Sequence, residues 1–178
     1  PVITAVLAQN ASGVTRVDPV SESMLDAQIE TLLQEMPPAA VKIGMLGGAP
    51  AVRAAVRALE RTSAFAVCDP VLQASGGGEL LDAEGRETLI RDLLPRVGVL
   101  TPNRPEAARL AGITVDDEAS VVRAARLLRE RGARAVLVKG GHAAGAVTHD
   151  YWLDEAGGFW LSSLRVDTAA GHGTGCTL

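Results

Sequence analysis

Hydrophobic positions along the chain alternate between short continuous runs and longer stretches with helical spacing. Continuous apolar runs are typical of strands buried on both faces, whereas apolar residues three or four apart mark one face of a helix. The expected strands are Val2–Gln9, Val41–Leu46, Phe65–Leu72, Val97–Leu100 and Ala135–Lys139. The expected helices between them are 21–36, 49–61, 82–94, a short one from Pro105, and 118–131.

The pattern changes in the last part of the chain. Two apolar segments, Ala146–Leu153 and Gly158–Val166, stand close together and predict a hairpin. The earlier alternation of strands and helices predicts right-handed β–α–β units and a parallel sheet. We therefore expect one α/β domain over residues 1–178, a three-layer sandwich with helices on both faces of a mostly parallel sheet and a late antiparallel hairpin.

Composition and charge exclude several classes of partner. No apolar run is long enough to span a bilayer, so no membrane partner is expected. The net charge is −4 and the arginines are scattered, which leaves no electrostatic footprint for nucleic acid. The two cysteines, Cys68 and Cys176, lie far apart and form no CxxC pair. We expect no disulfide framework, no zinc site and a cytoplasmic location.

Polar residues and glycines follow the expected strands. The carboxyl ends of parallel strands lie at one edge of a sheet, and ligands bind there. The segments at these ends are Gln9-Asn10, Gly44-Met45, Asp69-Pro70-Val71, Thr101-Pro102-Asn103 and Lys139-Gly140-Gly141-His142. Their convergence on one ligand site is the strongest functional signal in the sequence.

The last eight residues, 171–178, have three glycines at alternate positions, followed by a cysteine. Such a turn lets backbone N–H groups point at one spot, and a helix beginning there would add its positive end. This arrangement predicts an anion cradle with the Cys176 thiol at its rim. The alternative is a glycine-rich turn that only connects two elements.

The remaining candidates each have two interpretations. Asn103 and Glu106 stand three apart at a helix start, so they could hold a hydrated Mg²⁺ or simply cap the helix. Asp69 is either part of an Asp-Pro turn or an acidic group near phosphate and Mg²⁺. Met45 and Val71 are pocket walls or core. Lys139, at a strand end, can reach a ligand as a mobile point charge.

Six segments together resemble the hydroxymethylpyrimidine kinase / phosphomethylpyrimidine kinase family of thiamine biosynthesis, a branch of the ribokinase-like superfamily. The segments, in chain order, are 4–10, 41–46, 69–71, 101–107, 138–142 and 172–178. Ribokinase relatives usually carry Asp where this chain has Cys176, whereas the pyrimidine branch carries Cys. The resemblance runs over the whole chain.

The resemblance implies an activity, its cofactors and an assembly. The activity is transfer of the γ-phosphoryl group of ATP, with Mg²⁺, to 4-amino-5-hydroxymethyl-2-methylpyrimidine and then to its monophosphate. We expect a cytoplasmic homodimer that acts on this small-molecule pyrimidine. By position, Gln9 would hydrogen-bond the pyrimidine, and Met45 and Val71 would line its pocket.

The resemblance also assigns the phosphate-handling residues. Asn103 and Glu106 would organise Mg²⁺ and phosphate, with Asp69 nearby. Lys139 would neutralise phosphate charge. The anion hole would be formed by Gly173, Thr174 and Gly175, and Cys176 would be the base.

Two departures from the family pattern leave alternatives open. Family members begin with a further strand and loop and continue past the cysteine with helices, so we expect a fragment of a longer enzyme or a degenerate copy. The segment 73–78 also lacks the lysine expected beside its flexible loop. The rival functions are a pyridoxal-type kinase of the same fold and a non-catalytic sensor that binds the pyrimidine phosphate.

Overall fold

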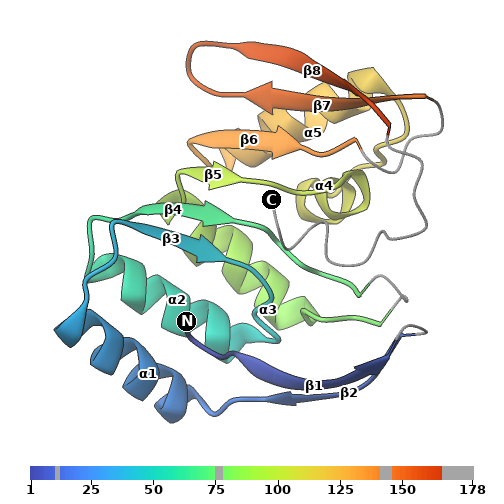
Figure 1. Ribbon diagram of the computed structural model, residues 1–178. Coiled ribbons are helices and arrows are strands. Elements are labelled where there is room, and N and C mark those ends of the chain that lie inside the picture. Colours follow the sequence, from blue (N-terminus) through green and yellow to red (C-terminus); the bar gives the residue numbers. More distant parts are fainter. Residues whose placement is uncertain (11–12, 75–77, 141–145, 166–178) are drawn as a thin grey trace.

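The computed structural model describes residues 1–10, 13–74, 78–140 and 146–165. Its centre is a six-stranded sheet with the order β3-β4-β5-β6-β7-β8 (Figure 1). The strands are β3 (Ala40–Ile43), β4 (Phe65–Cys68), β5 (Val99–Leu100), β6 (Ala135–Val138), β7 (Val147–Leu153) and β8 (Gly158–Leu164). β3 to β6 pair in parallel, and β7 and β8 are antiparallel. The mostly parallel sheet and the late hairpin are confirmed.

Along the chain, the described helices alternate with strands β3 to β6. They are α1 (Glu22–Glu35), α2 (Ala49–Glu60), α3 (Ala83–Thr88), α4 (Arg104–Ala111) and α5 (Glu118–Glu130). After α3 the chain continues through the π-helical turn η1 (Leu89–Leu93) and the 3₁₀ turn η2 (Leu94–Arg96).

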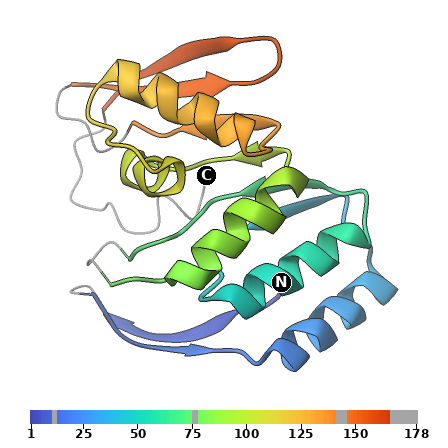
Figure 2. The ribbon, with the colours of Figure 1, turned by 180° about the vertical axis from the view of Figure 1, so that it is seen from behind.

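Strand order sets the face on which these helices lie. From β3 to β6 each strand lies next to the one before it in the chain, so right-handed crossovers place their helices on the same face. Figure 2 shows α2, α3 and α5 in front of the strands. The second helical layer of the expected sandwich is not found in the ranges described, and it stays a prediction. None of these helices is long and apolar enough to cross a membrane.

Caps at the helix ends explain where several helices begin. Asp82, at the start of the helix expected over 82–94, accepts a hydrogen bond from the Gly85 N–H at 2.7 Å. Ser21 caps α1 by accepting from the Met24 N–H at 3.4 Å. Each cap satisfies a backbone donor that has no partner within its helix. Local sequence therefore sets these helix starts.

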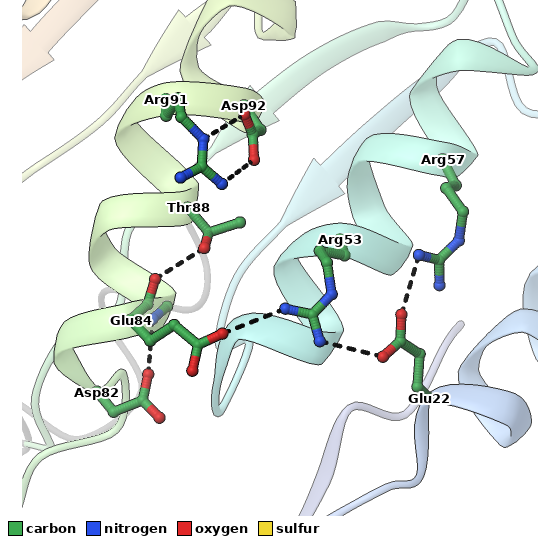
Figure 3. Close-up of polar contacts among 9 residues, drawn as sticks. Glu22, Arg53, Arg57, Asp82, Glu84, Thr88, Arg91 and Asp92 are labelled. Carbon is green, nitrogen blue, oxygen red and sulfur yellow. Dashed lines mark hydrogen bonds and ion pairs between the residues drawn. The ribbon is translucent and has the colours of Figure 1, made fainter.

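The core lies between the helices and the sheet. Its largest fully buried side chains include Leu25, Val52, Leu72, Leu93, Leu100, Leu110, Val121 and Leu128. On the surface, ion pairs link three neighbouring helices (Figure 3). Arg53 of α2 contacts Glu22 of α1 at 3.2 Å and Glu84 of α3 at 3.4 Å. These partly exposed pairs contribute little to stability, and they connect α2 to α1 and to α3 at the surface.

The first expected strand, Val2–Gln9, has a different place from the one predicted. β1 (Ala5–Asn10) pairs antiparallel with β2 (Gly13–Pro19) in a separate two-stranded sheet. β2 was not predicted, because the hairpin is largely exposed and the pattern of this strand mixes polar and apolar residues. Figures 1 and 2 both show the end of β1 and the beginning of β2 on the side where the parallel strands have their carboxyl ends.

Candidate active site

Two side chains from non-adjacent strands meet at the carboxyl edge of the sheet. Lys139, which follows β6, donates from Nζ to Oδ1 of Asp69, which follows β4, at 2.8 Å. Thr101, which follows the intervening strand β5, places its hydroxyl 3.5 Å from the same oxygen. Only 8% of the Asp69 side chain and 19% of the Lys139 side chain are exposed. The expected convergence of strand ends therefore holds for these three residues.

Backbone hydrogen bonds continue the sheet into this site. The Asp69 N–H donates to the Ile43 carbonyl, the Thr101 N–H to the Cys68 carbonyl, and the Lys139 N–H to the Pro102 carbonyl, each at 2.8 Å. The three residues therefore leave the sheet in register with one another. A site built on strand ends in this way is placed more precisely than one built on loops.

Asn103 and Glu106 form a reciprocal cap at the start of α4. The Asn103 N–H donates to Oε2 of Glu106, and the Glu106 N–H donates to Oδ1 of Asn103, both at 2.8 Å. This is a capping box, so the helix-cap interpretation left open by the sequence is observed. A role for the pair in Mg²⁺ binding stays a prediction.

Burial controls the charge of Glu106. It is 7% exposed, and this desolvation raises the pKa of its carboxyl. The N–H groups of Asn103 and Leu72 and the charge of Lys139 oppose that rise, whereas the charge of Asp69 adds to it. Asp69 pairs with the Lys139 ammonium, and Glu106 is influenced by that charge at longer range. With both carboxyls ionised the three groups would carry one net negative charge, which a bound cation would relieve.

The donor set limits how a cation could be held. Across the described ranges, no group of three or more His, Cys, Asp or Glu side chains could hold a metal ion. Mg²⁺ commonly keeps several waters and takes one or two carboxylates together with substrate phosphates. Asp69 and Glu106 therefore fit a hydrated Mg²⁺ that reaches the site with a nucleotide, and they do not fit a metal caged by protein alone.

Cys68 lies directly before Asp69, inside the core. Burial raises the pKa of its thiol to about 12, and the charges of Asp69 and Glu106 act in the same direction. At neutral pH the thiol is therefore protonated and inert. Cys68 is thus a small apolar residue of the core.

The expected pyrimidine-binding residues lie on three separate segments. Gln9 is exposed in β1, near the hairpin tip. Met45 and Val71 are partly buried in the segments that follow β3 and β4. The Thr4 hydroxyl donates to the Met45 carbonyl at 2.8 Å and ties the base of the hairpin to the loop after β3. The contacts of Gln9, Met45 and Val71 with a substrate stay predictions.

Four expected catalytic residues, Gly173, Thr174, Gly175 and Cys176, lie outside the described residues. The anion cradle and the base therefore stay predictions. The structure also adds one residue that the sequence analysis missed. Asp150 of β7 accepts a hydrogen bond from the Gly140 N–H at 2.7 Å, directly beside Lys139.

Comparisons of the sequence with known proteins identify a family of kinases. The family model for phosphomethylpyrimidine kinase matches residues 1–178. The hydroxymethylpyrimidine/phosphomethylpyrimidine kinase of Rhizobium meliloti is 42% identical over 178 residues, which are 99% of this chain and 67% of the relative. The chain thus spans about two thirds of that enzyme.

Solved structures point the same way. The crystal structure of phosphomethylpyrimidine kinase from Clostridium difficile 630 is 33% identical, with a TM-score of 0.79 over 92% of this chain and 70% of the other. The pyridoxal kinase of Staphylococcus aureus with AMP-PCP and pyridoxal is 29% identical, with a TM-score of 0.88 over 99% and 64%. The full-length match to the family model and the 42% identity establish that the chain belongs to the phosphomethylpyrimidine kinase family.

Proposed function

We propose that this chain carries the catalytic core of a kinase that phosphorylates 4-amino-5-hydroxymethyl-2-methylpyrimidine and then its monophosphate, with ATP as donor. The observation that carries the proposal is the buried contact between Lys139 and Asp69 at the carboxyl edge of the sheet. This contact supports the proposal because Lys139 would meet a nucleotide phosphate at this edge of the sheet. The names of the relatives and the AMP-PCP held by a structural neighbour support ATP as donor.

Phosphoryl transfer depends on positioning and charge neutralisation more than on covalent chemistry. Lys139 would exchange its contact with Asp69 for a phosphate oxygen, which its flexible side chain allows. Asp69 and Glu106 would then face Mg²⁺, which supplies charge neutralisation when it is bound. Cys176 would accept the proton of the substrate hydroxyl, and the N–H groups of residues 173–175 would hold the transferred phosphoryl group.

A pyridoxal-type kinase is the second candidate. The observation that favours it is the TM-score of 0.88 with a kinase that has pyridoxal bound. The two activities would share Lys139, Glu106 and Cys176 and would differ at the ring-binding residues Gln9, Met45 and Val71. For either activity we expect a small-molecule substrate, a cytoplasmic location and a homodimer.

Turnover by the full-length protein with both substrates tests the proposal. We expect ATP-dependent phosphorylation of the pyrimidine and its monophosphate, and a much lower kcat/KM with pyridoxal. Lys139→Met should lower kcat/KM for ATP by about 10²–10³-fold, because a fixed charge on the phosphate is lost. Lys42→Met is the matched control, since Lys42 lies exposed on β3. Tight binding of the pyrimidine phosphate without any turnover would support a sensor and contradict the proposal.

A further inference from the structure

The backbone at Gly140 is in close contact with the backbone of β7. A Cβ at this position would be 1.9 Å from the His149 carbonyl oxygen, so any side chain there would collide with backbone. The β6–β7 pairing register is Val136↔Leu153, Leu137↔Trp152 and Val138↔Tyr151. Continued by two residues, it would set Gly140 opposite His149. The chain therefore stays beside β7 after the regular ladder has ended.

Where the hydrogen-bond ladder between β6 and β7 ends, a side chain replaces the main-chain acceptor. Oδ1 of Asp150 accepts the Gly140 N–H at 2.7 Å, in place of a main-chain acceptor on β7. On the other side of β6, the Lys139 N–H donates to the Pro102 carbonyl at 2.8 Å. Two consecutive N–H groups, those of Lys139 and Gly140, are thus fixed from opposite sides. The peptide that carries Lys139 is held between β5 and β7.

We propose that Asp150 is a positioning residue for Lys139, acting through the Gly140 N–H. This inference rests on the proposed function only in giving Lys139 a phosphate to bind. Asp150 is partly buried and makes no hydrogen bond or ion pair with Asp69 or Glu106, all three being described residues. Its effect on a reaction would therefore pass through the backbone at Gly140. A carboxylate acceptor makes a stronger hydrogen bond than a neutral one, which suits a point where the sheet no longer restrains the chain.

Positioning matters here because Lys139 reaches across two strands to Asp69. A small rotation of the peptide at residues 139 and 140 would swing the long lysine side chain away from the carboxyl edge. Misplacement by about 1 Å can cost roughly 10²-fold in rate when a group must meet a substrate in one orientation. The contact at Gly140 is therefore expected to affect catalysis more than its modest stabilising energy suggests.

Two conservative variants separate the hydrogen bond from the charge. Asp150→Asn keeps an acceptor oxygen in place and loses the charge, whereas Asp150→Glu keeps the charge and displaces the acceptor by one methylene. We expect Asp150→Asn to retain most of kcat/KM for ATP and Asp150→Glu to lose about tenfold or more. The matched control is Asp154→Glu at the β7–β8 turn, where Asp154 accepts the Ala156 N–H at 2.8 Å. The control should leave kinetics unchanged.

A double-mutant cycle tests whether the effect passes through Lys139. In a Lys139→Met background, Asp150→Glu should change kcat/KM for ATP by less than about twofold, because the residue that it positions is gone. Full additivity of the two losses would overturn the proposal. A loss from Asp150→Asn as large as or larger than ten-fold, with Asp150→Glu close to wild type, would overturn it as well, since charge and not the placement of the Gly140 acceptor would then be the cause.

A measurement without turnover separates this inference from the proposed function. In ¹³C-lysine-labelled full-length protein, the signal absent from Lys139→Met identifies the Lys139 side chain. Asp150→Glu should shift that signal, whereas Asp154→Glu should not. If the wild-type protein phosphorylates neither substrate, the proposed function fails while this shift still decides the positioning role. An unshifted Lys139 signal in Asp150→Glu would overturn the inference even in an active kinase.

Discussion

Lys139 and Asp69 form an ion pair across the carboxyl ends of three neighbouring strands, with Nζ and Oδ1 2.8 Å apart. Both side chains are largely withdrawn from water. A pair in this setting is costly to break from one side, because the remaining charge stays buried. The contact therefore serves the folded state and, in the proposed reaction, holds the lysine until a phosphate replaces the carboxylate.

Asp69→Asn tests the structural part of this contact. The substitution keeps the shape and one acceptor but leaves the Lys139 ammonium without its countercharge. We expect the free energy of unfolding to fall by about 1–3 kcal/mol, measured by urea denaturation. Asp18→Asn is the control, because Asp18 pairs with Arg16 on the surface with both side chains more than half exposed. A stability loss no larger than that of the control would show that the buried pair is not stabilising.

Glu106→Gln separates the cap from the predicted Mg²⁺ role. Glutamine can still accept the Asn103 N–H, so the capping box and the fold should survive. Loss of the carboxylate should lower kcat/KM at limiting Mg²⁺ by about 10–10²-fold, with partial recovery at high Mg²⁺. Asp117→Asn in the second capping box, at the start of α5, is the matched control. If both variants keep full activity at every Mg²⁺ concentration, Glu106 is a cap alone.

The pH dependence of stability should carry opposite signs at these two caps. The pKa of Glu106 is raised by burial, so its ionisation opposes folding: stability is highest below the ordinary Glu pKa and falls as pH rises through the folded value. The pKa of Asp117 is lowered by its hydrogen bonds from Ser120, so its contribution is present at neutral pH and lost in acid. In urea unfolding from pH 4 to 8, the free energy of unfolding of Glu106→Gln should increase relative to that of the wild type as pH rises. A constant difference over that range would contradict the assignment for Glu106.

The two cysteines should react very differently with alkylating reagents. Cys68 is buried, and its thiol pKa of about 12 should protect it at pH 8 until the protein unfolds. Cys176, as the proposed base, should be alkylated in the native protein with parallel loss of turnover. Cys176→Ala should cost about 10²–10⁴-fold in kcat, whereas Cys176→Asp should retain part of it. Wild-type turnover in both variants would remove the base assignment.

Gly140→Ala and Gly98→Ala differ in what a new methyl group would meet. At Gly140 it meets the backbone of His149 at 1.9 Å, whereas at Gly98 it meets the Phe65 ring at 2.3 Å. Phe65 is about half exposed and can turn aside. We expect Gly140→Ala to lower the free energy of unfolding by about 1–3 kcal/mol and Gly98→Ala to lower it by less, both measured by thermal or urea unfolding. Equal losses would show that the β7 backbone yields as easily as a surface ring.

Much of the fold could be predicted because local signals and tertiary packing agree. The parallel strands have continuous apolar sequences, which are typical of a parallel sheet, and Asp82 caps its helix by accepting the Gly85 N–H. The expected strand Phe65–Leu72 ends earlier, at Cys68, where Asp69 and Pro70 turn out of the sheet. The hairpin strand β2 was missed because it lacks a buried face and hence a clear period.

The site could be predicted only as far as the strand-end rule applies. That rule brought Asp69, Thr101 and Lys139 together, because each follows a parallel strand. Asp150 escaped it because β7 runs the other way, so the beginning of β7, and not its end, lies at the site edge. The sequence spacing of Asn103 and Glu106 fits both a cap and a cation site, and only coordinates could show that the cap forms.

The strand order also sets a sequence of events in folding. β7 and β8 are joined by a short turn and pair over seven residues, so this hairpin can form from local contacts. The contact between Asp69 and Lys139 joins residues 70 positions apart and needs β4, β5 and β6 already aligned. Long-range closure of this kind comes late in folding. We therefore expect mild denaturant to break the contact between Asp69 and Lys139 before it removes the hairpin, so that the proposed activity would be lost before the secondary structure.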